Sequence, residues 1–426
     1  MTQALQRHNH VGRLKDFCQV GDGAHASIAR QEHGVMYLSA KNFKSSGLDL
    51  SNVDYISEGD YEKHFGKTKK AVTTPVKGDV LFGIIGSLGT PYTVKHRDRF
   101  GLSSSVAILR PSSGLCPDYL YHFMTSSAFQ SAVHAIKSGV AQGFLSLEMV
   151  KNLPLVTHEI NVQRKIAAIL SAYDELIDNN QHRIALLERM AEEIYREWFV
   201  RMRFHGYEKT TFNKGLPSDW EICEIGRKFA TCLGGTPSRA ELSYWGGEIP
   251  WINSGEVNKL RIVEASEYLT EDGLRYSATK IMPRRTTVIA ITGATLGQVS
   301  LTEIAVCANQ SVVGVYDSVG VYSEYIFQYV KTNIENLIAK QSGGGQQHIN
   351  KDIVEKEKIL LPPPDLIGQY NQIVRPIFDQ IRTLMFSTQG YTQVRDRLLP
   401  RLISGKLSVE NLDIQFPPSM REEAHA

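Results

Sequence analysis

Two glycine-rich segments are the first candidates for a chemical role. Gly293-Ala-Thr-Leu-Gly297 and Gly343-Gly-Gly-Gln-Gln347 could offer successive backbone N–H groups to a phosphate, of a nucleotide or of a nucleic acid. Neither is a GxGxxG motif that follows a strand and opens a helix, and the chain has no GxxxxGK(S/T) loop. Turns that permit close backbone approach are the simpler interpretation, because glycine adopts conformations closed to other residues.

Recognisable catalytic motifs are absent from the sequence. The 13 histidines show neither HExxH nor paired zinc-ligand spacing, and the five cysteines form no CxxC pair. Ser103-Ser-Ser105 lacks the GxSxG elbow of a hydrolase. Pro362-Pro-Pro-Asp365 lacks the Asn/Asp-Pro-Pro-aromatic order with which DNA amino-methyltransferases hold a flipped base. We therefore expect no catalytic, cofactor-binding or metal-binding residue in this chain.

The composition is that of an ordinary globular protein. The 47 basic and 45 acidic residues among 426 give a net charge of +2, so any nucleic acid site must be a local patch. Apolar runs are far shorter than a membrane span, and no signal-like stretch follows the N-terminus. Scattered cysteines without metal spacing favour buried thiols. We expect a soluble, cytoplasmic protein.

The chain repeats itself at an offset of about 204 to 214 residues. Met36–Phe43 resembles Pro250–Val257, and Tyr119-Leu-Tyr-His122 resembles Tyr325-Ile-Phe-Gln328. Each half then shows β-branched runs that end at a glycine, followed by a short helical pattern. This order predicts a duplicated α+β unit of about half the chain.

Each half closes with a long stretch of helical period. Apolar residues recur every three or four positions over 161–203 and again over 366–403, as in a seam between helices. About forty helical residues make a rod of about 60 Å, too long for the interior of a small domain. Because Pro376 and Gly390 lie inside the second stretch, that helix should either begin near Arg375 or bend there. Antiparallel pairing of the two helices would bury both apolar stripes.

One pair of motifs resembles a known family. Leu233-Gly-Gly-Thr-Pro-Ser-Arg239, followed by Tyr244-Trp-Gly-Gly-Glu-Ile-Pro-Trp251, is similar to a target-recognition domain of the specificity subunit of type I restriction-modification enzymes. The resemblance extends over nearly the whole chain, including the helical segments. The first copy departs from the motif, since Val20-Gly-Asp-Gly23 stands where Gly234-Gly-Thr-Pro237 would be expected.

The resemblance implies a non-catalytic DNA-binding subunit. Its layout would be an α+β fold with two pseudo-repeated α/β recognition domains, residues 1–157 and 205–364, joined by antiparallel helices over 158–204 and 365–410 that form a coiled-coil-like spacer, before a tail over 411–426. In that family each domain reads half of a bipartite DNA target, and two adenine methyltransferase subunits dock on the helices. S-adenosylmethionine, ATP and Mg would belong to those subunits and to the restriction subunits that translocate and cut foreign DNA.

Candidate DNA contacts follow from the polar side chains that read base edges or clamp phosphates. In the first domain they are Lys41, Asn42, Lys67, Lys69, Lys70, Lys95, Arg97, Arg99 and Gln142. In the second they are Ser238, Arg239, Asn253, Ser254, Arg284, Arg285, Asn309, Gln310 and Gln346. Solvated charge runs remain the alternative for the basic clusters, and a structural role remains open for the two glutamines.

An aromatic end of the first long helix raises a second question. Met190, Tyr195, Trp198 and Phe199 could pack against the second helix or anchor the methyltransferase subunits. Two other classes of protein stay open: an autonomous methyltransferase or nuclease with diverged motifs, and a structural coiled-coil adaptor. Neither the DNA half-sites nor the spacer length follows from the sequence.

Overall fold

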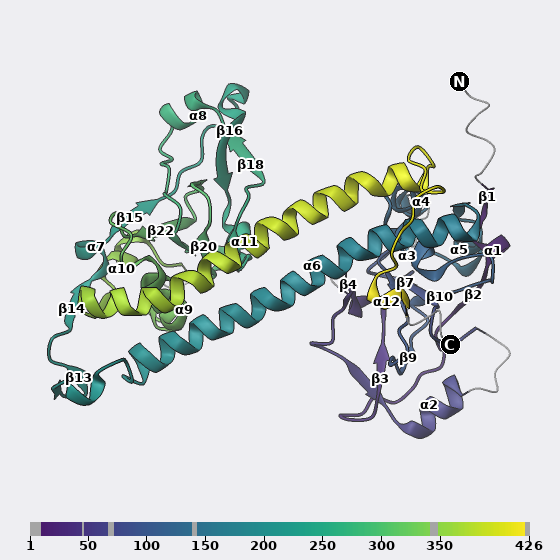
Figure 1. Ribbon diagram of the computed structural model, residues 1–426, viewed down its shortest axis with the longest axis horizontal. Coiled ribbons are helices and arrows are strands. Elements are labelled where there is room, and N and C mark those ends of the chain that lie inside the picture. Colours follow the sequence, from purple (N-terminus) through teal and green to yellow (C-terminus); the bar gives the residue numbers. More distant parts are fainter. Residues whose placement is uncertain (1–9, 45–46, 67–71, 139–142, 341–347, 422–426) are drawn as a thin grey trace. The chain divides into compact units, whose positions relative to one another are not determined.

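The computed structural model describes residues 10–44, 47–66, 72–138, 143–340 and 348–421. The chain divides into two compact units, which we call unit 1 (residues 1–178 and 390–426) and unit 2 (residues 179–389). Both boundaries fall inside long helices, α6 (Ile160–Tyr195) and α11 (Pro364–Ile403), so each helix contributes to both units. Unit 1 is therefore built from the first and last parts of the chain (Figure 1).

Unit 1 contains two main sheets. The first is antiparallel, in the order β2 (Cys18–Asp22), β10 (Val106–Pro111), β7 (Val80–Gly83), β8 (Pro91–Thr93). The second is mixed, with β3 (Val35–Leu38) antiparallel to β6 (Asp54–Ile56) and parallel to β9 (Phe100–Leu102). Two short antiparallel pairs complete the strands: β1 (His10–Arg13) with β11 (Pro154–Thr157), and β4 (Phe43–Lys44) with β5 (Gly47–Leu48).

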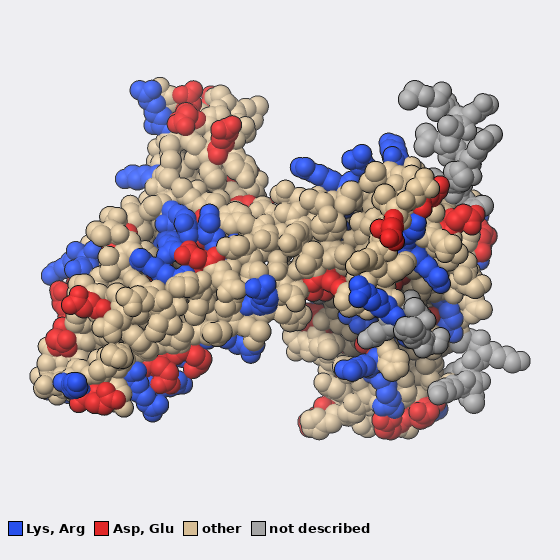
Figure 2. Space-filling model, viewed as in Figure 1, with Lys and Arg blue, Asp and Glu red and all other residues tan. Residues whose placement is uncertain are grey.

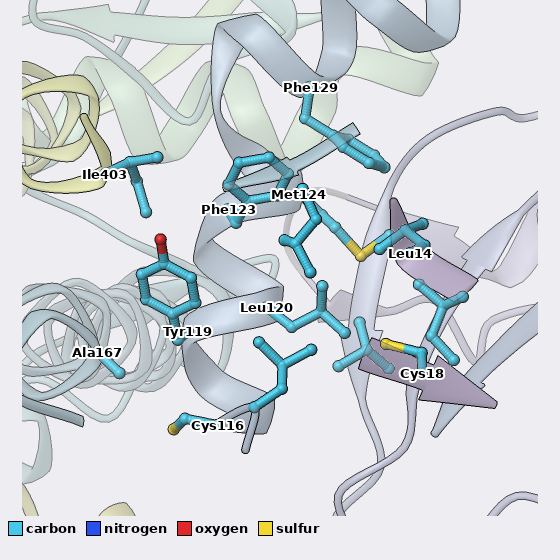
Figure 3. Packing of buried hydrophobic residues seen from close by; sticks show 14 of the residues in the cluster. Leu14, Cys18, Cys116, Tyr119, Leu120, Phe123, Met124, Phe129, Ala167 and Ile403 are labelled. Carbon is cyan, nitrogen blue, oxygen red and sulfur yellow. The ribbon is translucent and has the colours of Figure 1, made fainter. Parts of the chain in front are cut away.

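Most helices of unit 1 pack on its antiparallel sheet, and one, α2, packs on the mixed sheet through Phe65. They are α1 (Leu14–Phe17), α2 (Glu58–Phe65), α3 (Pro117–Thr125), α4 (Ser127–Ser138), α5 (Leu147–Lys151) and α12 (Pro418–Arg421), with parts of α6 and α11. Figure 3 shows the side chains on both faces of α3. Leu120 is directed toward Leu14 and Cys18, and Tyr119 is directed toward Ala167 of α6 and Ile403 of α11. Met420 of the predicted tail and Val409, just before that tail, are buried in this same core.

Unit 2 repeats the arrangement. Its larger sheet runs β15 (Ala230–Leu233), β22 (Val312–Tyr316), β19 (Thr287–Ala290), β20 (Val299–Thr302), β17 (Arg261–Ile262). Its mixed sheet places β16 (Trp245–Ile252) antiparallel to β18 (Glu267–Leu269) and parallel to β21 (Cys307–Ala308). The pair β14 (Glu221–Glu224) with β23 (Lys358–Leu361) and the pair β12 (Phe212–Asn213) with β13 (Leu216–Pro217) complete the strands. Its helices are α7 (Ile225–Lys228), α8 (Glu271–Arg275), α9 (Ser323–Ile338) and α10 (Lys351–Lys356).

Equivalent hydrogen bonds support the duplication. Tyr119 Oη donates to the carbonyl of Val156 at 2.8 Å, and Tyr325 Oη donates to the carbonyl of Leu360. Each bond ties a helix of the globular part, α3 or α9, to the strand that precedes the long helix, β11 or β23. The predicted α+β class and the pseudo-repeat are confirmed.

The two long helices pack antiparallel within each unit. In unit 1, Arg395 Nη1 of α11 donates to Asp174 Oδ1 of α6 at 2.6 Å. In unit 2, Ile184 of α6 packs with Ile381 and Leu384 of α11. No helix among the described residues is long and apolar enough to cross a membrane.

The start of α11 and the end of α6 differ from the prediction. Helix α11 begins at Pro364 and continues through Pro376 and Gly390, so the alternative start near Arg375 is wrong. Helix α6 ends at Tyr195 and passes into a π-turn over Arg196–Val200, closed by a bond from Arg201 N to Arg196 O at 2.8 Å.

Candidate nucleic-acid interface

The mixed sheet of each unit lies on the side of that unit remote from the long helices (Figure 1). Its central strand carries an aromatic residue that faces an acid across the antiparallel pair. Tyr37 of β3 pairs with Asp54 of β6, and Trp251 of β16 pairs with Glu267 of β18. The two sheets therefore place the same kinds of side chain at the same register.

An arginine stacks on this aromatic surface in unit 2. The Cζ atom of Arg239 lies 3.7 Å from the centroid of the Trp245 ring and 5.0 Å from that of Trp251. Its Nη1 and Nη2 atoms donate to the two carboxylate oxygens of Glu267 at 3.0 and 2.7 Å. The carbonyl of Ser238 accepts from Trp245 Nε1 at 3.1 Å, so this candidate residue helps to hold the ring.

Unit 1 contains an equivalent arginine that the sequence analysis missed. The Cζ atom of Arg30 lies 4.0 Å from the centroid of the Tyr37 ring, and its Nε lies 3.7 Å from Asp54 Oδ2. Its Nη1 donates to the carbonyl of Ile28 at 2.6 Å. Lys41 Nζ lies 3.6 Å from the same Asp54 oxygen. Burial raises the pKa of Tyr37, and the charge of Arg30 opposes that rise.

A glycine precedes the arginine in both units for the same steric reason. A Cβ on Gly234 would lie 2.1 Å from the carbonyl oxygen of Asn309, and one on Gly23 would lie 2.2 Å from that of Leu102. The neighbouring backbone bonds correspond as well, since Gly23 N donates to Val106 O and Gly234 N donates to Val312 O. Gly23 therefore corresponds to Gly234, although the sequence around it departs from the motif.

Asn42 has a structural role. Its side chain is buried, its Oδ1 accepts from Ser39 N at 3.0 Å, and its Nδ2 donates to the carbonyls of Asp49 and Asn52. An amide with these internal bonds is not available to a base edge, so the predicted DNA contact is wrong for this placement.

The other amide candidates are only partly engaged. Asn253 Oδ1 accepts from Gly255 N at 2.8 Å, and Asn309 Oδ1 accepts from Ser311 N at 3.1 Å. Gln310 is exposed, and its Oε1 accepts from Thr236 Oγ1 at 2.5 Å. Ser254 is half-buried beside Asn253. These residues directly follow the strands β16 and β21, which are neighbours in the mixed sheet of unit 2.

The basic candidates of unit 1 divide into two groups. Lys95 and Arg97 are exposed in the turn after β8, and no acidic partner for either side chain is found among the described residues. Arg99 is ion-paired, because its Nη1 and Nη2 donate to both oxygens of Glu58 at 2.8 and 2.6 Å, although its side chain stays 51% exposed. Lys67, Lys69, Lys70, Gln142 and Gln346 lie outside the described residues.

Arg284 and Arg285 face helix α11 and enter an ion-pair network. Arg285 pairs with the buried Glu324 and with Asp379 of α11, the latter at 2.6 Å. Arg284 Nη2 lies 3.3 Å from the same Asp379 oxygen. Burial lowers the pKa of Arg285 despite these partners. Both side chains thus stabilise the junction of the sheet with α11 rather than standing free for DNA.

The four partner-binding candidates also separate. Tyr195 and Phe199 are buried in the core of unit 2 with Tyr325 and Tyr370, so packing in the core is the correct interpretation for both. Trp198 is partly buried against Tyr370, with ring centroids 5.9 Å apart. Met190 is 53% exposed and remains available on the helix surface.

The remaining chemistry is structural. Gly293–Gly297 forms a turn in which the N–H groups of Leu296 and Gly297 donate to Gly293 O and Ala290 O. Gly343–Gln347 falls outside the described residues. Burial raises the pKa of Cys18 to about 12. Among the described residues no group of three or more His, Cys, Asp or Glu side chains could hold a metal ion.

Figure 2 shows Lys and Arg interspersed with Asp and Glu on the visible face of each unit.

Two α+β units with the same strand order, each with an arginine stacked on its mixed sheet and both sharing the spacer helices, define a duplicated recognition protein. The chain belongs to the family of type I restriction-modification DNA specificity domains, whose sequence model matches residues 8–189 and again 217–384.

The curated relatives that match this chain are specificity subunits. The chain is 22% identical to the type I restriction enzyme MjaIX specificity subunit of Methanocaldococcus jannaschii over 418 residues, 94% of each chain. It is 20% identical to the HindI specificity subunit of Haemophilus influenzae, covering 80% of this chain and 88% of that one. The solved S subunit from M. genitalium has the same fold, with a TM-score of 0.61 at 14% identity over 93% of this chain and 96% of that one.

Proposed function

We propose that this chain is the non-catalytic DNA-reading subunit of a type I restriction-modification complex. The observation that carries the proposal is the coincidence of two family matches, residues 8–189 and 217–384, with two units of one topology. Each unit then reads one half of a bipartite target, and the recognition domains are the globular parts over 1–157 and 205–364. The complex would act on DNA in the cytoplasm.

The long helices are proposed to set the gap between the half-sites. Helix α6 has 36 residues, which corresponds to about 54 Å of continuous helix. Half-sites on one face of a duplex recur about every 34 Å, so a stiff helix of fixed length restricts which gaps fit. The same helices would carry two methyltransferase subunits, since Leu186, Met190 and Ile373 expose apolar side chains there. S-adenosylmethionine, ATP and Mg would be held by the methyltransferase and restriction subunits.

Nonspecific attraction to DNA would come from local cations rather than from the overall charge of +2. Lys95 and Arg97 suit phosphate contacts, because both are exposed on a turn of unit 1. Gln310, Asn253 and Ser254 suit the readout of bases in unit 2, since they cluster at the ends of β16 and β21.

The decisive experiment maps methylated adenines in a host that carries this chain together with methyltransferase partners. We expect a single bipartite sequence with an unread gap of fixed length. A complex that methylates without sequence preference would overturn the proposal. Tight binding of S-adenosylmethionine by the chain alone would instead favour an autonomous methyltransferase.

A length variant tests the spacer separately. Four residues inserted after Asp178, with helical sequence, should lengthen the gap while both half-sites stay the same. An unchanged gap in the methylated sites would show that the helices do not set it.

A further inference from the structure

The stacked arginines recur in the two units although the surrounding sequence does not. Arg30 and Arg239 each follow the equivalent glycine, Gly23 or Gly234, and each lies over the aromatic residue of the central strand. Each is paired with the acid at the same register of the adjacent strand, Asp54 at 3.7 Å or Glu267 at 2.7 Å. The aromatic residue and the acid differ in type between the units, but an arginine occupies the same position in both. This indicates that the arginine is the shared feature.

We propose that Arg30 and Arg239 are the matched DNA-contacting residues of the two units, one for each half-site, and that each binds a pair of acceptor atoms on the nucleic acid. This inference rests on the proposed function. The acceptor pair is either O6 and N7 of a guanine or two oxygens of a phosphate, because a planar guanidinium fits both.

The contacts in each unit orient the guanidinium and leave part of it open. An aromatic ring covers one face, and a carboxylate or carbonyl occupies some of the five N–H donors. The side chains nevertheless stay 43% exposed in Arg30 and 54% exposed in Arg239. In Arg239 both Nη atoms contact Glu267, which leaves the Nε edge for a second partner.

This preorganisation favours recognition. A free arginine carries about 2 kcal/mol of rotamer entropy, and stacking together with ion pairing restricts the side chain before DNA arrives. Asp54 and Glu267 are positioning residues in this scheme, since they hold the guanidinium plane without contacting DNA. Lys41 adds a second cation at Asp54 in unit 1, whereas two tryptophan rings hold Arg239 in unit 2.

The test uses the assembled complex with its methyltransferase subunits and compares R30Q with R239Q. Methylated sites are sequenced, and DNA binding is measured against salt concentration. If the arginines read guanine, R30Q should relax one base pair in one half-site and R239Q one in the other, each by about 5- to 150-fold. If they bind phosphate, each variant should weaken all sequences alike and reduce the salt dependence by about one charge.

Lysine variants separate these two sources. R239K keeps the charge but lacks the planar fork, so it should lose part of a guanine preference and should behave like the wild type for phosphate. Matched controls are K151Q in unit 1 and R227Q in unit 2, because each removes a partly exposed, ion-paired cation on a short helix, α5 or α7, outside the mixed sheets. Neither control should change a half-site or the salt dependence.

The outcomes distinguish this inference from the proposed function. A wild-type complex without sequence preference would overturn the DNA-reading role as a whole. A wild-type bipartite target that R30Q and R239Q leave unchanged, with unchanged salt dependence and only a lower melting temperature, would show that the arginines merely stabilise the sheet. An equal loss of specificity in the controls would also overturn the assignment.

Discussion

Units 1 and 2 share a topology but bury different polar groups where the sheets meet the long helices. Unit 1 places His122 there, with its Nε2 3.0 Å from Ser171 Oγ of α6. Unit 2 has Gln328 at the corresponding position and instead buries Arg261, whose Nη2 lies 2.6 Å from Glu188 of α6. The comparison shows that apolar residues and glycines maintain the duplicated scaffold. A buried polar residue can differ between the units when its hydrogen-bond or ion-pair partner differs as well.

The difference has an energetic meaning. Arg261 is fully buried between the rings of Phe327 and Phe378, and its Nη1 lies 3.3 Å from a second buried acid, Glu303. The counterpart at the junction in unit 1, Arg395 with Asp174, is partly exposed. A buried charge without its partner costs far more than an exposed one, so the two junctions should respond differently to the same kind of mutation.

The largest effect is expected from R261L. Because it leaves Glu188 buried without its cation and removes one of the arginines around Glu303, unfolding of unit 2 should become easier by about 3 to 5 kcal/mol. R395L in unit 1 should cost about 1 kcal/mol. All four tryptophans lie in the sequence of unit 2, so their fluorescence during denaturant unfolding reports on unit 2.

A control for R261L replaces Glu188 by leucine as well. Removing this acid together with the arginine should recover most of the lost stability, while Glu303 keeps Arg284 and Arg382. Equal costs for R261L and R395L would break the comparison between the junctions.

The next effect concerns the glycines that the two units share. G23A and G234A each force a Cβ to within 2.2 and 2.1 Å of a backbone oxygen, so each should destabilise its own unit by about 3 kcal/mol. Hydrogen exchange measured for each unit checks this. Gly114 and Gly368 have open space around the added atom, and alanine there should be neutral or slightly stabilising. Strongly unequal effects of G23A and G234A would contradict the equivalence of these turns.

A smaller effect depends on pH and belongs to unit 1. Burial lowers the pKa of His122 from its usual 6.5 to about 3, and Arg395 adds to this. Below pH 6.5 His122 is therefore protonated in the unfolded chain but neutral in the folded chain. Unit 1 loses stability as the pH falls from 6.5 toward 3 because protonation favours the unfolded state. Between pH 7.5 and pH 5 this residue should cost about 2 kcal/mol.

The variant H122Q, which introduces the residue of unit 2, should remove that part of the pH dependence. Its Nε2 can still approach Ser171, whereas Asp174, 3.9 Å from the histidine ring, stays in place. Hydrogen exchange of α3 at the two pH values measures the difference. An unaltered pH dependence in H122Q would assign the acid sensitivity to another group such as His158, whose pKa is also lowered by burial.

Sequence periodicity was sufficient for the duplication and the long helices because both depend on apolar residues at regular spacing. It misjudged Pro376, where a penalty of about 3 kcal/mol is outweighed by the burial of Tyr370, Val374 and Phe378 on the same helix. Local helix rules cannot foresee such a tertiary contribution.

The candidate site was only partly predictable. Arg239 was found from its motif, but Arg30 was missed because the loop between Gly23 and β3 has a different length and sequence in unit 1. Asn42 was misread because residue type does not reveal whether an amide caps a turn or faces solvent. A register-based comparison of Tyr37 with Trp251 would have pointed to Arg30.

The division of unit 1 between both ends of the chain affects the order of folding during synthesis. Unit 2 is continuous over residues 179–389 and has all its segments before translation reaches the end of α11. Unit 1 must wait for residues 390–421, which bring Leu402, Val409 and Met420 into its core. Until then its nascent hydrophobic surface is uncovered, so the first half of the chain to emerge from the ribosome is the last to be completed and the more dependent on chaperones.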